Sequence, residues 1–417
     1  MKVLYSGQAP YRYLPEDFAQ RYDSVVTTPY LDLVEPANMQ ESLHSYVEEL
    51  LLAARSGFDG VMVTEHSQTS YDLSPNPNLV AAILAHTTAV EGIDAAITVL
   101  GRSLGKSREP LRIAEEYAVL DTLSGGRLIA GLPVGLSYDA NQNGGIPPIE
   151  TRARYREGRA LLEKAWSATE PFAWNGKYSR YPIVNIWPRP MQQPHPPFWI
   201  PGSGSPGTLA EILGHDEVFT YLSHFGPKLT GPRIFNRFWD MAEEMGRDRN
   251  PYRLAFMQVV CVGETDAEAE HLYGEHLQRH FRNSFGSVPM SGFSLPGYTD
   301  IRGVEAILRD HGDMGIAGRL REITFRELAD TRAAIVGGPE TVREQIIEFV
   351  KEFRIGNLLV MLHGGSMPHE LARYNIGLFA TEVLPHLRGI WDDEGWEHRW
   401  WPTGIGARTP AGSAAAV

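Results

Sequence analysis

Residues 92–131 read GIDAAITVLGRSLGKSREPLRIAEEYAVLDTLSGGRLIAG, and this stretch decides the fold class. Residues 94–100 are apolar on both faces, which is typical of a parallel strand covered by helices on each side. Residues 111–120 repeat apolar side chains at helical spacing against a charged face. The glycine pair at 125–126 tolerates left-handed backbone, so it predicts the end of this helix before a second buried strand. The stretch therefore predicts one βαβ unit.

The same alternation continues along the rest of the chain. Further strands are predicted at residues 3–6, 60–63, 198–200, 217–222, 253–262 and 357–362. Further helices are predicted at residues 41–55, 79–86, 150–166, 341–353 and 369–387. Eight strands alternating with helices, with no Gly-x-Gly-x-x-Gly motif after the first strand, favour a (β/α)8 TIM barrel over a doubly wound sheet.

A barrel with insertions also suits the length of 417 residues. The sequence predicts a single domain over residues 1–401. Its insertions are expected near residues 7–38, 171–193 and 278–332, where proline and aromatic residues or a broken rhythm interrupt the alternation. Residues 402–417 are mostly small and are expected to form a disordered tail.

The composition excludes several classes of function. A net charge of −13 argues against nonspecific binding of nucleic acid, which needs clustered positive charge. No run of about 18 apolar residues is present, so no membrane span is expected. The first ten residues lack the apolar core of a signal peptide, and Cys261 is the sole cysteine. These features predict a cytoplasmic protein without an intrachain disulfide.

Polar residues at the predicted strand exits are the candidates for chemistry, because active sites of such barrels assemble there. His66, beside Glu65, is a candidate proton donor or acceptor, although a histidine that only caps its loop is equally compatible with the sequence. His224 and His363 occupy similar exits. The spacing of these four residues is not that of a metal site, so no metal is expected.

Two loops could bind an anion. The turn at 201–208 is rich in glycine and serine and precedes a helix, whose N-terminus favours negative charge, but a plain turn with an N-cap fits equally. Arg102, Lys106 and Arg108 concentrate positive charge in a loop of an acidic chain. A solvated loop surface would account for that concentration as well.

Several segments, in the same order, resemble the bacterial luciferase family of flavin-dependent monooxygenases. They are SGFDGVMVTEH (56–66), LDTLSGGRLIAGLPVG (120–135), PHPPFWIPGSGSPGTLAEILG (194–214) and IVGGPETVREQIIEFV (335–350). The resemblance implies a luciferase-like barrel with His66 as a catalytic residue. It also implies that Ala95 and Ala96 form the small pair against which the flavin ring lies. The flavin phosphate would bind at four positions of the glycine- and serine-rich turn: Ser203, Gly204, Ser205 and Thr208.

The sequence departs from the family at one position. Val134 stands where bacterial luciferase has an arginine that reaches the phosphate. The resemblance then implies that Arg102, Lys106 or Arg108 neutralises the phosphate, or that the cofactor is the deazaflavin F420 used by relatives of the same superfamily.

The activity that the resemblance implies is oxygenation of a small organic substrate, such as an aldehyde or ketone. Reduced FMN would react with O2 to give a flavin peroxide, and a barrel mouth closed by the insertions would exclude water. No second nucleotide-binding domain is visible, so a separate NAD(P)H:flavin reductase is expected as a partner. F420-dependent hydride transfer and flavin binding without turnover are the alternatives. A homodimer is also implied.

Overall fold

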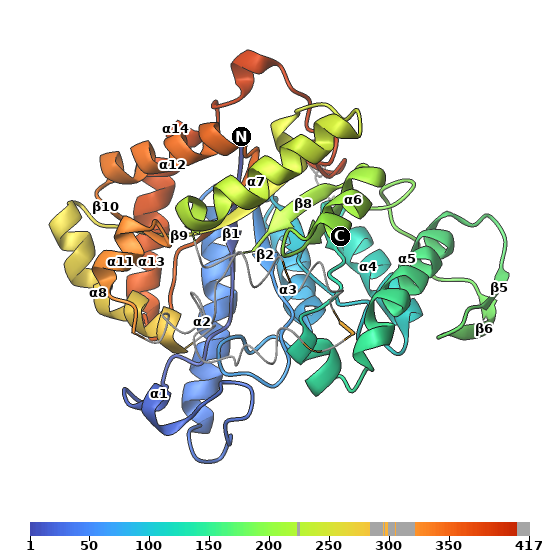
Figure 1. The fold of residues 1–417 in the computed structure, drawn as a ribbon, viewed down its shortest axis with the longest axis horizontal. Coiled ribbons are helices and arrows are strands. Elements are labelled where there is room, and N and C mark those ends of the chain that lie inside the picture. The colour runs from blue at the N-terminus through green and yellow to red at the C-terminus, as the bar shows by residue number, and fades with distance from the viewer. Residues whose placement is uncertain (223–225, 284–294, 296, 299–304, 306–321, 407–417) are drawn as a thin grey trace, which may run out of the picture.

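Eight parallel strands close into a barrel in the computed structural model of the protein (Figure 1). The pairing runs β1–β2–β3–β4–β7–β8–β9–β11, and β11 pairs with β1 to close the ring. The strands are β1 (Lys2–Ser6), β2 (Gly60–Val63), β3 (Ala96–Val99), β4 (Leu128–Gly131), β7 (Phe198–Pro201), β8 (Val218–Tyr221), β9 (Leu254–Val262) and β11 (Asn357–Met361). The structure describes residues 1–222, 226–283, 295, 297–298, 305 and 322–406. The predicted (β/α)8 TIM barrel is confirmed.

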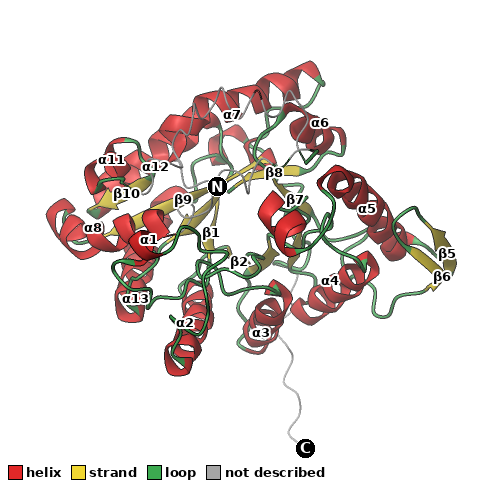
Figure 2. Cartoon of the chain, turned by 60° about the horizontal axis from the view of Figure 1, so that its bottom comes forward, coloured by secondary structure: helices red, strands yellow, loops and turns green. Residues whose placement is uncertain are grey.

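Helices surround the strands on the outside (Figure 2). They include α2 (Pro36–Arg55), α3 (Pro77–Val90), α4 (Pro110–Ser124), α5 (Thr151–Ser167), α6 (Pro206–Gly214), α7 (Gly226–Glu244), α8 (Asp266–Asn283), α12 (Pro339–Phe353), α13 (His369–Leu378) and α14 (Leu384–Leu387), with the short α1 (Phe18–Arg21) and α11 (Phe325–Asp330). Parallel neighbouring strands need long crossover connections, and most of these helices supply them.

Successive strand residues alternate between two apolar layers. Val3 and Tyr5 pack in the layer between strands and helices, whereas Leu4 belongs to the cluster inside the barrel. Trp199 and Met257 fill that interior with other large side chains and are almost fully buried. The barrel is therefore a packed core, and any ligand must bind at one of its ends.

Several helices begin earlier than predicted because proline occupies their first position, and α2 and α3 are two of them. α2 starts at Pro36 rather than residue 41, and α3 starts at Pro77 rather than residue 79. Proline suits the first helical position because its fixed φ is helical and its missing N–H would have no partner there. The sequence analysis took both prolines as loop residues.

A ninth strand that the sequence analysis did not predict lies beside β9. β10 (Ala334–Gly337) pairs in parallel with the carboxyl-terminal part of β9, from Val259 to Val262. It has four residues and begins two residues after the predicted insertion ends, in a stretch between residues 332 and 341 to which the sequence analysis assigned no element. The ninth strand extends the wall of the barrel at its carboxyl end.

Two of the predicted insertions contain ordered structure. Residues 171–193 include an antiparallel hairpin of β5 (Phe172–Asn175) and β6 (Arg180–Val184). Figure 1 shows this hairpin projecting beyond α5 at the edge of the molecule. Within residues 7–38, the described Phe18 and Val25 form a small core with Tyr71 and Tyr138.

Residues 402–406 contact the barrel, although the sequence predicted a disordered tail from residue 402 onward. The N–H of Thr403 donates to the side chain of Gln192 at 3.0 Å. The N–H of Gly404 donates to the carbonyl of Gly126 at 2.9 Å. A Cβ at Gly404 would lie 2.6 Å from that carbonyl oxygen, so the small residue serves close packing here. The prediction was wrong for this segment, and the residues after it lie outside the described part of the chain.

Candidate active site

Polar side chains gather at the carboxyl ends of the barrel strands, as the sequence predicted. His66 follows β2, Arg102 follows β3, and the turn containing Ser203 follows β7. Because all the barrel strands are parallel, these exits share one end of the barrel, called the mouth below. His224, the predicted candidate after β8, lies outside the described residues.

His66 is paired with Asp139, which lies in a π-helical turn (Tyr138–Asn143) after β4. Nδ1 of His66 lies 2.9 Å from Oδ2 of Asp139, and Oδ1 of the same carboxylate accepts the N–H of Ser67 at 2.9 Å. Burial lowers the pKa of His66, but the hydrogen bond and charge of Asp139 raise it by more, so the net pKa is raised. Among the described residues, Nε2 of His66 has no hydrogen-bond partner, which leaves it available to a ligand.

Two tyrosines extend the hydrogen bonding from His66. The hydroxyl of Tyr138 lies 3.0 Å from Nδ1 of His66, and the hydroxyl of Tyr71 is hydrogen-bonded to that of Tyr138. Both rings belong to the small core that Phe18 and Val25 complete. Residues of the long loop after β1 therefore fix the side chains around the histidine.

Asp72 is a second carboxyl group near His66. It accepts the hydroxyl of Thr64 at 2.6 Å and the N–H of Ala9 at 3.3 Å. Burial raises the pKa of Asp72 to about 6, although the positive charge of His66 opposes this rise. The site therefore contains a carboxyl group whose charge changes just below neutral pH.

The sequence analysis missed Asp139, Tyr138, Tyr71 and Asp72. Tyr138 and Asp139 are adjacent in the irregular segment after β4. This aromatic residue followed by a carboxylate is the sequence feature that could have indicated partners for His66. Its significance depends on the chain folding back across the mouth, since Asp139 is 73 residues away from His66.

Glu65 holds two of the cations that the sequence singled out. Its Oε1 lies 2.7 Å from Nζ of Lys106 and 3.4 Å from Nη1 of Arg102. Its Oε2 accepts the N–H of Ser103 at 3.0 Å. Arg102 also lies 3.2 Å from Glu116 of α4. The two cations are therefore fixed in a network of ion pairs, and Arg108 on the same loop is exposed.

A cavity of about 260 Å³ opens between the loops that follow β2, β3 and β4. Its lining consists mainly of polar and charged residues: Glu65, Ser67, Gln68, Arg102, Ser103, Lys106, Ser107, Ile113, Asp139, Asn143 and Gly144. Ile113 is the single aliphatic member of this set. The cavity is thus a polar chamber directly beside the pair of His66 and Asp139.

The glycine- and serine-rich turn after β7 leads into α6, as predicted. The hydroxyl of Ser205 donates to that of Thr208 at 2.9 Å, and Ser205 makes no side-chain cap to the backbone of the helix. Gly204 has a φ of +78°, and a Cβ there would lie 2.7 Å from Ile234. Arg237 of α7 donates to the Gly204 carbonyl at 3.1 Å, which brings a guanidinium group to this turn.

The structure does not place Ala95 and Ala96 at the mouth. Ala96 is the first residue of β3 and pairs with Gly60, the first residue of β2, so both alanines lie at the amino end of the strand. They are 1% and 0% exposed. Nη1 of the buried Arg127 donates to the Ala95 carbonyl at 2.5 Å. The predicted contact of a flavin ring with this pair is wrong, because the packed interior separates the pair from the mouth.

At the carboxyl ends of β3 and β4, buried glycines bring backbone close to backbone. A Cβ at Gly101 would lie 2.2 Å from the carbonyl oxygen of Gly131. A Cβ at Gly105 would lie 2.2 Å from the carbonyl oxygen of Val134, which also accepts the Ser103 hydroxyl at 2.9 Å. These glycines allow the loop after β3 to pack directly on the exit of β4. At Val134, where bacterial luciferase has an arginine, this chain therefore makes backbone contacts with the loop after β3.

His363 has a structural role. Its Nε2 accepts the N–H of Gln8 at 3.2 Å, and burial lowers its pKa to about 4. His363 is therefore a neutral, buried imidazole that accepts a backbone N–H. This fits a histidine that caps its loop better than a proton donor or acceptor in catalysis.

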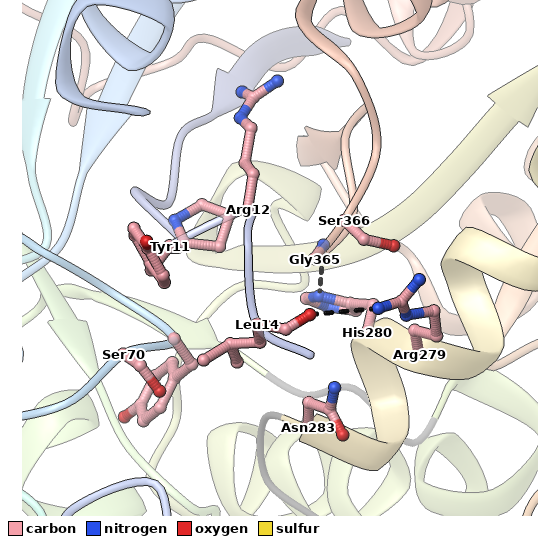
Figure 3. A pocket seen from close by; sticks show the side chains of 11 residues that line it. Tyr11, Arg12, Leu14, Ser70, Arg279, His280, Asn283, Gly365 and Ser366 are labelled. Atoms are coloured by element: carbon pink, nitrogen blue, oxygen red, sulfur yellow. Dashed lines mark hydrogen bonds between the residues drawn. The ribbon is translucent and has the colours of Figure 1, made fainter. Parts of the chain in front are cut away.

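A second, small cavity at the mouth is too small for a flavin (Figure 3). It measures about 20 Å³ and lies between the loop after β1, residues Ser70 and Tyr71, helix α8 and the loop after β11. The Gly365 N–H donates to His280 at 3.1 Å, and Arg279 donates to the Leu14 carbonyl at 3.0 Å. A volume of this size corresponds to roughly one water molecule.

Comparison with known proteins identifies the family. Residues 25–354 match the family model described as luciferase-like monooxygenase. The chain belongs to this family. This luciferase-like monooxygenase is 22% identical to the alkanal monooxygenase alpha chain of Photobacterium leiognathi over 84% of its own length and 94% of that protein.

Two solved structures support the same fold. The oxygenating constituent of 3,6-diketocamphane monooxygenase from Pseudomonas putida, a complex with FMN, aligns with a TM-score of 0.63 at 20% identity, covering 91% of this chain and 98% of that one. An F420-dependent secondary alcohol dehydrogenase aligns with a TM-score of 0.60 at 16% identity, covering 93% and 99%. In the described part of this luciferase-like monooxygenase, no helix is long and apolar enough to cross a membrane.

Proposed function

We propose that the protein is the oxygenase component of a two-component system that uses reduced FMN and O2 to oxygenate a small organic substrate. The observation that carries this proposal is the pair of His66 and Asp139 beside a polar cavity at the barrel mouth. Membership of the luciferase-like monooxygenases supports the use of flavin. Aldehydes and ketones are the substrate classes to test first.

The flavin ring is proposed to lie over the exits of β3 and β4, which the buried Gly101 and Gly131 allow to pack closely on each other. Its phosphate is proposed to bind the turn after β7, with Ser203, Ser205 and Thr208 as hydroxyl donors and Gly204 giving the ligand room. The N-terminus of α6 favours an anion at this turn. Arg237, already hydrogen-bonded to Gly204, supplies the positive charge that Val134 lacks.

When bound, reduced FMN supplies the electrons that activate O2, and the protein supplies orientation, protons and exclusion of water. Asp139 keeps the proton on Nδ1 of His66 and favours the charged imidazole. Nε2 of His66 is then the nitrogen that gives a proton to the reacting oxygen or holds it in place. The hydroxyl of Tyr138, which lies 3.0 Å from the same Nδ1, helps to hold the imidazole in place.

The loops around the mouth are proposed to exclude water from the reacting atoms. Tyr71 and Tyr138 are buried under Phe18 of the loop after β1. The hydroxyl of Tyr298, within the long insertion, donates to the Gly135 carbonyl at the exit of β4. Both contacts cover the side of the mouth where His66 lies, and dry sites protect reactive intermediates from hydrolysis.

F420-dependent hydride transfer is the second candidate function. The observation that favours it is the absence of the family's arginine at Val134, whose carbonyl is already engaged by Ser103. A barrel that binds flavin without turnover is the third. In both cases the same mouth would hold the cofactor.

Three further features complete the proposal. A separate NAD(P)H:flavin reductase would deliver the reduced flavin, since the Pseudomonas putida relative is itself only the oxygenating constituent of its monooxygenase. A cytoplasmic location fits the single, buried Cys261. A homodimer is proposed through α3, which has no charged residue and exposes Leu79, Ile83 and Val90 along one face.

The test is binding and turnover with purified protein. FMN and F420 are titrated in oxidised and reduced forms, and O2 consumption is followed with reduced FMN and a panel of aldehydes and ketones. Tight binding of reduced FMN and an oxygenated product detected by mass spectrometry support the first function. Substrate oxidation by F420 without O2 consumption supports the second, and binding of neither cofactor contradicts both.

A further inference from the structure

The cavity between the loops after β2, β3 and β4 contains two carboxylates that are fully engaged by the protein. Oδ2 of Asp139 faces His66, and its Oδ1 accepts the N–H of Ser67. Oε1 of Glu65 faces Lys106 and Arg102, and its Oε2 accepts the N–H of Ser103. Each carboxylate oxygen therefore already has a partner that is a donor.

The donor groups that line the same cavity still have N–H protons without an acceptor among the described residues. Nζ of Lys106 contacts Glu65 and the hydroxyl of Ser67 at 2.8 Å, and an ammonium group has a third proton to give. Arg102 uses Nη1 and Nε for its ion pairs, and its Nη2 has no partner in the part of the chain that the structure describes. Gln68 and Ser107 add an amide and a hydroxyl to the lining.

The difference between these donors and the carboxylates indicates which chemical groups a ligand of this cavity carries. A ligand in the cavity meets cationic donors with remaining protons, whereas each carboxylate oxygen already accepts from at least one donor of the protein, so the lining favours a ligand that presents oxygen acceptors. The side chains of Lys106 and Arg102 are 14% and 18% exposed, respectively, and therefore partly shielded from solvent. Charge-assisted hydrogen bonds at such positions are stronger than neutral ones. A long aliphatic chain would find one apolar side chain, Ile113, and would leave these charged groups desolvated without partners.

We propose that this cavity holds the substrate and that the substrate carries a carboxylate bound by Lys106 and Arg102. This inference rests on the proposed function, since it assigns the occupant as the molecule that is oxygenated. The carboxylate would anchor one end of the substrate, and the reacting carbon would then lie on the side of His66. Flavin phosphate is also an oxygen anion, so the test must separate the two sources.

Binding of simple carboxylates tests the proposal without turnover. Benzoate and acetate are titrated by calorimetry into the FMN-loaded protein, each against its uncharged isostere, benzamide or acetamide. The wild-type protein is expected to bind each acid at least about tenfold more tightly than the amide, the difference that one charge-assisted hydrogen bond supplies. Lys106→Gln and Arg102→Gln are each expected to abolish most of this preference, and Lys106→Arg to retain it.

Arg112→Gln is the matched control, because this arginine lies near the same loop, is 67% exposed in its side chain and pairs only with Glu115 among the described residues. It removes the same charge and is expected to leave the preference unchanged. Thermal unfolding of every variant establishes that it folds. If Arg102→Gln does not fold, Lys106→Gln alone tests the proposal. Equal affinity of the wild-type protein for acid and amide overturns the proposal, as does a preference that survives in the Lys106 variant.

The relative affinity for FMN and riboflavin distinguishes the two anions. If the cavity binds the substrate, Lys106→Gln leaves the preference for FMN over riboflavin within about twofold of the wild type, well below the tenfold step of one lost charge-assisted contact. A drop of tenfold or more assigns the cavity to the phosphate and overturns the proposal. Failure of the proposed function has a different signature: no oxygenated product is formed with reduced FMN and O2, while the preference for carboxylates remains.

Discussion

Asp139 lies 2.9 Å from Nδ1 of His66, and the two residues come from the exits of different strands, β4 and β2. The contact turns a histidine with ambiguous sequence context into one with a raised pKa and with an Nε2 that has no partner among the described residues. The side chains are 13% and 4% exposed, so solvent weakens their attraction little.

Replacing Asp139 with Asn is expected to lower the pKa of His66. The sign follows from linkage. Because the pKa of His66 is raised in the folded protein, its ion pair with Asp139 stabilises the fold fully at a pH below the ordinary histidine pKa. This stabilisation is lost as the pH rises through the pKa of His66 in the folded protein. If protonated His66 is the active form, activity falls as pH rises through the same value. In Asp139→Asn the falling limb of kcat/KM should move to lower pH, which a pH–rate profile measures. An unmoved limb contradicts the role of Asp139.

His66→Ala is expected to reduce kcat by about a hundredfold or more, because positioned proton transfer contributes at least that much. FMN affinity should change little, since the free nitrogen of His66 acts on the reacting oxygen. Single-turnover kinetics with reduced FMN measure the loss. The exposed His271 on α8 offers a matched control, and His271→Ala should behave as wild type. Equal losses in both variants would remove His66 from the chemistry.

Gly101→Ala is expected to destabilise the protein by about 1–3 kcal/mol and to weaken flavin binding, as overpacking of a close backbone contact does. The added Cβ would lie 2.2 Å from the Gly131 carbonyl oxygen and would push apart the exits of β3 and β4. Chemical denaturation and FMN titration measure the two effects. Gly377→Ala is the control: nothing lies within 4 Å of its Cβ position in α13, so it should be neutral or stabilising.

The sequence predicted the barrel because periodicity is a local property. Residues 92–131 show strand, helix and strand without reference to any other segment, and the structure has β3, α4 and β4 there. β10 was missed because it directly follows the predicted insertion, where no alternation of strand and helix was visible. Pro36 and Pro77 were misread because proline serves both loops and first helical turns.

The site was predicted less completely, because partners are set by tertiary contacts. The strand rule nominated His66 after β2 and the turn after β7, but Asp139 has no local pattern that ties it to His66. Ala95 and Ala96 were assigned from the family resemblance, as the small pair against which the flavin ring lies. Side-chain size does not distinguish the two ends of a strand, and the pairing of Ala96 with Gly60 places them at the end opposite the mouth.

Arg12→Met is expected to destabilise the fold by about 3–5 kcal/mol, the usual cost of leaving a buried charge without its partner. Arg12 lies 2.7 Å from Glu49, and the two side chains are 6% and 1% exposed. Burial alone would raise the pKa of Glu49, but His369 and Arg12 lower it overall. This contribution is therefore present above the ordinary glutamate pKa and is lost as pH falls through the lowered value.

Urea denaturation of wild type and Arg12→Met measures the prediction. The difference in unfolding free energy should be large at neutral pH and should shrink in acid, where Glu49 takes up a proton. Arg21→Met is the control, because Arg21 and its partner Asp17 are 49% and 56% exposed and such pairs contribute little. A difference that is independent of pH would show that Arg12 stabilises the fold through packing alone.

Ile83→Glu is expected to dissociate the proposed homodimer. In a two-fold dimer the substitution acts twice, and burying two unpaired carboxylates beside Leu79 and Val90 should weaken association by about a hundredfold or more. Analytical ultracentrifugation over a range of micromolar concentrations measures the change. Ile183, which is 73% exposed on the β5–β6 hairpin, supplies the control. Ile183→Glu should leave the dimer intact, and a wild-type chain that sediments as a monomer throughout that range would refute the α3 interface.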